Sequence, residues 1–247
     1  MPVSPDAEPR PSPRLLVLDT SSERLVVSAL AGEREAHADE EGAARSSQRL
    51  LPLAFELLDV VGLRLGDLQA VAFGRGPGAF TGLRSACSVA QGLALGLGCP
   101  VLALDSLAVW AEDAFAQQGL REVWVAVDAR MDEAYAAPYR RDGVQWIALR
   151  PPALWTLPAL TAAWREAPPQ AVAGNALSAF GDRLPCGDAL RFDTLAQRAA
   201  SFARLARAAW DHGARLDAAE ALPLYLRDKV ALTTVERDAQ RAARAST

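Results

Sequence analysis

The stretch FGRGPGAFTGLR, from Phe73 to Arg84, constrains the fold of this chain more than any other segment. Four glycines and one proline lie between an apolar run, typical of a buried strand, and a run with helical character. Glycine-rich turns at strand-to-helix junctions often hold phosphates on backbone N–H groups. The stretch therefore raises two alternatives, a nucleotide site or a tight structural turn.

The residues of the stretch favour the structural alternative. A phosphate loop of the GxxxxGK[ST] type needs a lysine, and Lys229 is the only lysine of the chain. The window GRGPGA loosely matches GxGxxA, but its proline removes one N–H that a phosphate cradle would use. We expect Gly76-Pro77-Gly78 to form a turn with positive φ, and Thr81 to cap the helix that follows.

That helix, predicted over residues 81–97, carries small side chains at four-residue spacing. They form two neighbouring rows, Ala86, Ala90 and Ala94, and Ser88, Gly92 and Gly96. Glycine costs about 1 kcal/mol relative to alanine in a helix interior. Two tolerated glycines indicate that another helix approaches this stripe closely, within the chain or across an interface.

The composition is that of an ordinary globular protein, with 51% hydrophobic and 23% charged residues. A formal net charge of −4 argues against autonomous nucleic-acid binding, for which a strongly basic face is expected. The three cysteines lack a CxxC motif and suit a reducing compartment. Because we find neither a signal peptide nor a membrane-spanning apolar run, we expect a cytoplasmic protein without a membrane partner.

Hydrophobic periodicity predicts two related α/β lobes, over residues 14–107 and 108–232, each with three strands followed by alternating helices and strands. We keep open that the last segment of the second lobe packs back on the first. Residues 1–13 are expected to be a disordered leader and residues 233–247 a polar tail. In chain order we expect strands at 15–18, 25–30, 34–38, 68–73, 101–104, 122–127, 134–139, 144–149 and 170–173, and helices at 46–61, 81–97, 106–118, 156–165 and 195–210.

Six segments of the chain together resemble one protein family. They are LDTSS at 18–22, SSQRLLP at 46–52, AVAFGRGPGAFTGLR at 70–84, AQGLALGL at 90–97, VDARMDEAY at 127–135 and LPLYLRDKVA at 222–231. In this order they closely resemble the bacterial tRNA threonylcarbamoyladenosine biosynthesis proteins of the TsaB type. The resemblance covers essentially everything after the leader. It implies a two-lobed fold of the actin, Hsp70 and sugar-kinase class (ASKHA).

The resemblance also implies a function. Members of this family are non-catalytic dimerisation or scaffold subunits, not enzymes in their own right. They belong to a complex that forms N6-threonylcarbamoyladenosine at position 37 of tRNAs reading codons that start with A. The implied partners are the catalytic relative TsaD, the ATPase TsaE, a second copy of the chain when it is alone, and tRNA only indirectly through the complex.

The partner surface is expected on two helices. The helix predicted to begin at Ser46 or Ser47 and to stop at Gly62 is apolar on more than one face, and the next helix carries the small-residue stripe. The alternative is that both faces are buried inside the lobe. The residues that we expect at the interface are Leu50, Leu53, Leu57, Arg84, Ser88, Ala90 and Gly92.

A metal site is not expected. Catalytic relatives carry a metal-binding HxxxH after their own GPG turn, and the corresponding positions here are Ser106 and Trp110. A serine hydroxyl is a poor ligand for a transition metal, and the indole N–H can only donate. Either Asp105 or Ser106 is expected to cap the helix that starts there.

The nucleotide site is expected to be weak, vestigial or shared. Asp19, Thr20 and Ser21 occupy the first phosphate-contacting turn of this fold class, where Ser21 replaces a frequent glycine. With Gly76 and Gly78 they are the cofactor-binding candidates. We expect no cofactor bound by this chain alone, with ATP or ADP possible at the interface of the complex. Asp128 is expected to stabilise its turn rather than to hold magnesium.

Two enzyme functions remain as alternatives. A small-molecule phosphotransferase of the ASKHA type would need an intact phosphate turn and a pair of magnesium-binding carboxylates. A metallopeptidase would need the missing HxxxH. The sequence supplies neither set cleanly.

Overall fold

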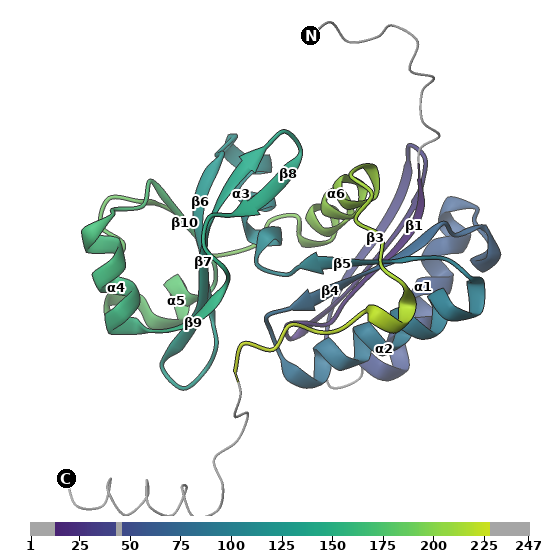
Figure 1. The fold of residues 1–247 in the computed structure, drawn as a ribbon, viewed down its shortest axis with the longest axis horizontal. Coiled ribbons are helices and arrows are strands. Elements are labelled where there is room, and N and C mark those ends of the chain that lie inside the picture. Colours follow the sequence, from purple (N-terminus) through teal and green to yellow (C-terminus); the bar gives the residue numbers. More distant parts are fainter. Residues whose placement is uncertain (1–12, 43–45, 228–247) are drawn as a thin grey trace, which may run out of the picture.

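The computed structural model describes residues 13–42 and 46–227, which form two lobes, each built on one mixed β-sheet (Figure 1). Residues 1–12 of the expected leader and the whole expected tail at 233–247 lie outside the described residues. The predicted two-lobed α/β fold is confirmed.

The first lobe has a five-stranded sheet in the order β3-β2-β1-β4-β5. Its strands are β1 (Arg14–Asp19), β2 (Arg24–Ala31), β3 (Arg34–Glu41), β4 (Ala70–Gly76) and β5 (Val101–Asp105). Short turns make β1, β2 and β3 antiparallel, whereas helical connections make β4 and β5 parallel to β1. Residues 15–18 of β1 are fully buried, as expected for a central strand that is covered on both faces.

Helices cover both faces of this first sheet. On one face lie α1 (Ser46–Val61) and α2 (Phe80–Leu97), and on the other lies α6 (Arg198–Asp211). The hydroxyl of Ser28 on β2 donates a hydrogen bond to the carbonyl of Ala199 at 3.1 Å. A helix from late in the chain therefore completes the core of the first lobe.

The second lobe has a six-stranded sheet in the order β11-β10-β6-β7-β8, in which β9 also pairs with β7. Its strands are β6 (Glu122–Asp128), β7 (Glu133–Asp142), β8 (Gln145–Ala148), β9 (Ala153–Thr156), β10 (Ala171–Ala173) and β11 (Leu190–Phe192). One face packs against α4 (Leu157–Glu166) and α5 (Ala176–Phe180), and the other against α3 (Ala108–Gln118). The described residues of the two lobes also include the short 3-10 helices η2 (Leu65–Asp67), η3 (Gly181–Arg183) and η4 (Ala218–Glu220).

The helices α3 and α6 lie between the two sheets and contact each other, so one apolar core extends through both lobes (Figure 1). Asp113 of α3 is buried, and its carboxylate accepts hydrogen bonds from the backbone N–H groups of Ala196 and Gln197, at 3.0 and 2.8 Å. These groups lie just before α6, where a negative charge is favourable. The carboxylate of one helix thus fixes the start of the other.

The structure differs from the predicted elements around the glycine stretch. Strand β4 continues to Gly76 instead of ending before the first glycine, because its last residues pair with β5 across a register shift. The residue that caps α2 is Ala79, not Thr81. The N–H of Ala79 donates to the carbonyl of Ser21 at 2.7 Å, so a contact between distant segments fixes where the helix starts.

Other differences have similar causes. Helix α3 is capped by Leu107 and begins at Ala108 rather than at residue 106, because the Asp105 carboxylate accepts a hydrogen bond from the Leu107 N–H at 2.9 Å and forms a turn before the helix. Helix α6 begins at Arg198 rather than at residue 195, after the two N–H groups bound by Asp113. The sequence patterns did not predict β9, β11 and α5, which have four, three and five residues and are too short for a periodic signal.

Candidate functional site

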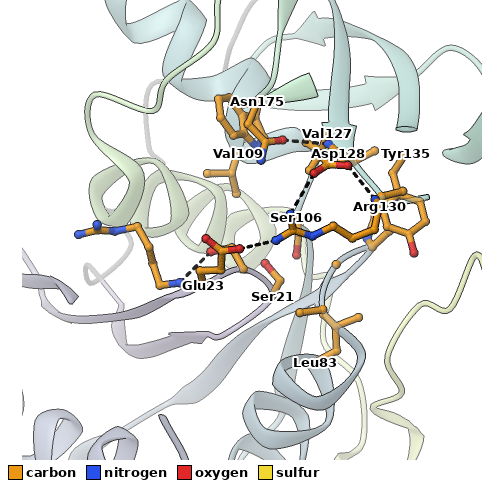
Figure 2. Close-up of a pocket in the computed structure, with 18 of the residues that line it drawn as sticks. Ser21, Glu23, Leu83, Ser106, Val109, Val127, Asp128, Arg130, Tyr135 and Asn175 are labelled. Atoms are coloured by element: carbon orange, nitrogen blue, oxygen red, sulfur yellow. Dashed lines mark hydrogen bonds and ion pairs between the residues drawn. The ribbon is translucent and has the colours of Figure 1, made fainter. Parts of the chain in front are cut away.

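A cleft with a volume of about 1130 Å³ lies between the two lobes. Its walls include the β1–β2 turn, the β4–α2 turn, the start of α3, the β6–β7 turn and the segment that follows η4. Figure 2 shows Glu23 of the first lobe and Arg130 of the second meeting within it. Ser21 and Gly78, two of the predicted nucleotide-site residues, line this cleft, so its donors and charges decide what it can bind.

Asp19 lies beneath the cleft at the end of β1 and is completely buried. Its Oδ2 accepts a hydrogen bond from Ser21 Oγ at 3.0 Å, whereas its Oδ1 has no hydrogen-bond partner among the described residues. Burial raises the pKa of Asp19 to about 6, and the Ser21 hydrogen bond and the charge of Arg198 offset this only partly. The carboxyl group is therefore held in a site that favours its neutral form.

Three glycines of the glycine stretch lie directly against the turn formed by residues 19–21. A Cβ added at Gly74, Gly78 or Gly82 would come within 1.9, 2.3 and 1.7 Å of an atom of this turn. No side chain fits at such distances. Thr20 Oγ1 also donates to the carbonyl of Gly82 at 2.6 Å. These glycines, in β4, in the β4–α2 turn and in α2, therefore permit close contact between the glycine stretch and residues 19–21.

The backbone donors of the glycine stretch are partly used within the chain. The N–H of Gly76 donates to Ser106 Oγ at 3.0 Å, and that of Ala79 donates to the Ser21 carbonyl. Gly76 has a φ of +109°, as a turn glycine was predicted to have. The structure thus brings together Asp19, Thr20, Ser21, Gly76 and Gly78, the predicted nucleotide-site residues. Their role in binding a nucleotide stays a prediction.

The charges that line the cleft are paired. Among the described residues, four guanidinium groups line the cleft, and each lies within ion-pair distance of a carboxylate. The pairs are Arg24 with Asp39 and Glu41, Arg130 with Glu23 and Asp128, Arg198 with Asp39, and Arg227 with Glu133. A phosphate group entering the cleft would have to compete with these carboxylates.

Asp128 has partners that agree with a structural role in its turn. Its Oδ1 accepts from the N–H of Arg130 at 2.7 Å, and its own N–H donates to Asn175 Oδ1 at 2.9 Å (Figure 2). The first interaction closes the turn between β6 and β7, and the second holds this turn against the segment that follows β10. These contacts fit the predicted role of Asp128 in stabilising its turn.

The predicted interface residues on α1 and α2 fall into two groups, one buried and one at least partly exposed. Leu50, Leu53 and Ala90 are at most 3% exposed and belong to the core beneath the sheet, so they cannot contact a partner. This corrects the prediction for these three residues. Leu57 is half-buried, and the exposed members of the predicted set are Arg84, Ser88 and Gly92.

The two rows of small residues on α2 have different environments. Ala86, Ala90 and Ala94 are buried, whereas Ser88, Gly92 and Gly96 are exposed, and a Cβ added at either glycine would meet no atom within 4 Å. The exposed row has no partner helix within the described residues. Exposed apolar side chains that the sequence patterns did not single out also lie on these helices, namely Leu51, Phe55, Val60 and Leu95.

Known proteins with similar sequences are TsaB proteins. The tRNA threonylcarbamoyladenosine biosynthesis protein TsaB of Escherichia coli K12 is 42% identical over 130 residues, which are 52% of this chain and 56% of that protein. TsaB of Haemophilus influenzae is 40% identical over 131 residues, 53% of this chain and 56% of that protein. The chain spans about half the length of the curated relatives that it matches.

A solved structure and a family model extend the match. The structure named YeaZ from Pseudomonas aeruginosa has a TM-score of 0.78 and 39% identity, covering 87% of this chain and 100% of that one. The family model described as "TsaD: tRNA N6-adenosine threonylcarbamoyltransferase" matches residues 33–202, more than half of the chain. The chain belongs to the TsaB branch of this family. The resemblance to TsaB proteins predicted from the six segments is confirmed.

This TsaB-family chain uses the two positions of the HxxxH motif for packing. Ser106 and Trp110 are each 7% exposed, and Ser106 Oγ accepts the hydrogen bond from Gly76. Among residues 13–42 and 46–227, no group of three or more His, Cys, Asp or Glu side chains is placed to hold a metal ion. None of the helices in these ranges combines the length and apolar character needed to cross a bilayer.

Proposed function

We propose that this TsaB-family chain is a subunit of the complex that forms N6-threonylcarbamoyladenosine at position 37 of tRNAs reading codons that start with A. The observation that carries the proposal is the likeness to YeaZ over the whole length of that chain, together with the TsaB names of the curated relatives. The comparisons do not favour the alternatives of a phosphotransferase or a metallopeptidase. We place the protein in the cytoplasm, where tRNA modification of this kind would occur.

Within this proposal the chain is a non-catalytic subunit. The paired charges in the cleft support this role, because no unpaired cation of the cleft wall is available among the described residues to stabilise a transferred phosphate. The use of Ser106 in a backbone hydrogen bond supports it as well. We expect no cofactor of its own, and ATP or ADP only at an interface shared with the catalytic subunit.

The exposed helical surface is the proposed partner site. Arg84, Ser88 and Gly92 lie at four-residue spacing on α2, with Leu95 of α2 and Phe55 of α1 also exposed. Small residues let a second helix approach closely, and apolar neighbours provide area to bury. We propose that this surface pairs with TsaD in the complex and with a second copy when the chain is alone. TsaE and tRNA would then join through the complex.

Reconstitution tests this function. Purified TsaD, TsaE and tRNA are supplied with threonylcarbamoyl adenylate as the donor and with ATP, and threonylcarbamoyladenosine formation is assayed with and without this chain. The chain alone is assayed for ATPase activity. We expect modification to depend on the chain and no ATPase activity from the chain alone. Equal modification without the chain would contradict the role as a subunit. Micromolar ATP affinity of the isolated chain in a calorimetric titration would contradict the absence of its own nucleotide site.

A further inference from the structure

The segment after α6 runs back over the first lobe before it reaches the second (Figure 1). Leu216 pairs with Val101 of β5 through two backbone hydrogen bonds of 2.9 and 3.0 Å. Next, η4 packs beside α2, where Gln91 Nε2 donates to the carbonyls of Ala218 and Ala221 at 3.0 and 2.9 Å. The segment is therefore fixed to the first lobe up to residue 221.

The segment then follows the glycine stretch along the cleft. The N–H of Leu224 donates to the carbonyl of Arg75 at 2.7 Å, and its carbonyl oxygen lies 2.9 Å from where a Cβ at Gly76 would be. Residues 224–227 all line the cleft. The absence of a side chain at Gly76 thus leaves room for this segment rather than for a ligand.

Tyr225 holds the same segment against the start of α2. Its ring centroid lies 4.7 Å from that of Phe80, and its hydroxyl accepts a hydrogen bond from Arg84 Nε at 3.1 Å. The guanidinium of Arg84 also lies 3.9 Å above the Phe80 ring. Stacked aromatic and guanidinium groups of this kind keep an exposed segment in place.

Arg227 carries the segment across to the second lobe. Its guanidinium forms an ion pair with Glu133 at 2.7 Å and donates to the carbonyls of Ala129 and Arg130 at 3.1 and 3.3 Å. All three partners belong to the β6–β7 turn or to the strand beside it. A single side chain therefore ties the end of the segment to the opposite wall of the cleft.

The β6–β7 turn needs such support. Arg130, Met131 and Asp132 have φ values of 64°, 58° and 60°, and three consecutive non-glycine residues in the left-handed region are unfavourable unless their surroundings hold them. Arg130 also forms an ion pair with Glu23 across the cleft (Figure 2). The turn is thus held by Arg227 from one side and Glu23 from the other.

On the opposite side the two lobes are joined by buried contacts. The hydroxyl of Tyr139 on β7 donates to Asp105 Oδ2 on β5 at 2.6 Å, beside the layer of α3 and α6. These contacts leave the cleft mouth as the side on which the lobes can separate. On that side, the exposed Glu23–Arg130 ion pair and the polar contacts of Arg227 join the lobes, and Leu226 packs against the core that both lobes share.

We propose that residues 222–227 form a cleft latch, which holds the two lobes together at the cleft mouth and sets how far the cleft opens. Arg227 makes the contacts of the latch with the second lobe, and Gly76 is the position on the first lobe against which the latch packs. The proposal concerns the two lobes of this chain alone, so it stands independently of the proposed function.

Hydrogen exchange of the full chain tests the latch with the variant Arg227→Ala. The N–H of Ala129 donates to the carbonyl of Glu133, and that of Glu133 to the carbonyl of Arg130, so both amides report on the turn. We expect about fivefold faster exchange in peptides covering 129–133 and also in 21–24 and 106–110, which line the cleft. Glu133→Gln, which keeps the side-chain shape, should give the same pattern. Arg165→Ala, at an exposed site on α4, should change none of these peptides.

Which peptides exchange faster in the Arg227→Ala variant decides whether the segment is a latch between the lobes. If Arg227→Ala accelerates exchange only within 222–227 and leaves 129–133 and 21–24 unchanged, the segment is a local strap and the latch is wrong. Adding Glu133→Gln to Arg227→Ala should have little further effect, because the two side chains form one contact. Fully additive effects of the two changes would also overturn the proposal.

Discussion

Gly82 lies in direct contact with Thr20. The hydroxyl Oγ1 of Thr20 donates a hydrogen bond to the Gly82 carbonyl at 2.6 Å, and a Cβ on Gly82 would lie 1.7 Å from the Thr20 carbonyl oxygen. The two residues are 62 positions apart in the sequence, Thr20 between β1 and β2 and Gly82 in α2. Their contact explains the glycine at this position by packing within the protein, without a ligand.

Gly82→Ala should destabilise the protein by about 3 kcal/mol, because the added methyl group meets backbone atoms that cannot move aside locally. Urea unfolding followed by circular dichroism measures this change. The matched control is Gly92→Ala on the same helix, where a Cβ meets nothing within 4 Å. That change should stabilise the protein by about 0.5–1 kcal/mol, because alanine is the better helix former. Equal effects of the two substitutions would contradict the packing explanation.

Asp19 should make stability depend on pH in a specific direction. Burial raises its pKa in the folded state to about 6, above the ordinary value of 3.8 for an aspartate, so the folded protein favours the protonated carboxyl. The resulting stabilisation is complete below pH 3.8 and is lost as the pH rises through 6. Relative to Asp19→Asn, the native chain should lose about 2 kcal/mol of unfolding free energy between pH 4 and pH 7. Urea unfolding of both proteins at each pH measures it, and parallel pH profiles would contradict the prediction.

Gly92→Arg should block association through the outward face of α2 without unfolding the monomer. The arginine would place a long charged side chain in the exposed small-residue row, where a partner helix is proposed to approach. We expect at least a tenfold weaker association with TsaD in a pull-down or by analytical ultracentrifugation. Gly66→Arg, at an exposed site in η2, is the control and should associate normally. Normal association of the Gly92 variant would place the interface elsewhere.

Replacing Glu112 should lower the free energy of unfolding strongly. Its buried carboxylate accepts from Arg204 Nε at 2.6 Å and from Trp146 Nε1 at 2.9 Å, and it also pairs with Arg141. Glu112→Ala leaves these donors uncompensated, so we expect a loss of about 3–5 kcal/mol in thermal or urea unfolding. The exposed Glu122 offers the control, and its replacement by alanine should cost less than about 0.5 kcal/mol. A similar loss for both would show that the buried network contributes little.

The sequence predicts the order of strands and long helices because their apolar periodicity is strong. Residues 15–18 and 46–61 illustrate this, since both elements lie where their patterns indicate. The start of α2 could not be predicted, because a contact from Ala79 to the distant Ser21 fixes it rather than a capping side chain. Short elements such as β11 depend on pairing with a neighbouring strand and carry no local signal.

Tertiary packing also limits how much of the candidate sites can be predicted from the sequence. The sequence correctly grouped Asp19 with the glycine stretch, but burial of Leu50 and Ala90 depends on which helix face meets the sheet. Both helices are apolar or small-sided on several faces, so periodicity alone could not separate the core rows from the exposed one. Arg227 was not singled out either, because its partners lie in and beside a turn almost a hundred residues earlier.

The position of α6 and residues 216–227 on the first lobe has a consequence for synthesis. Strands β1 to β5 leave the ribosome long before α6, which covers one face of their sheet, and before the segment that pairs with β5. The first lobe therefore emerges with one apolar face uncovered while the whole second lobe is being translated. Its folding can be completed only after translation has passed residue 227, so a nascent chain arrested earlier should bind chaperones through that face.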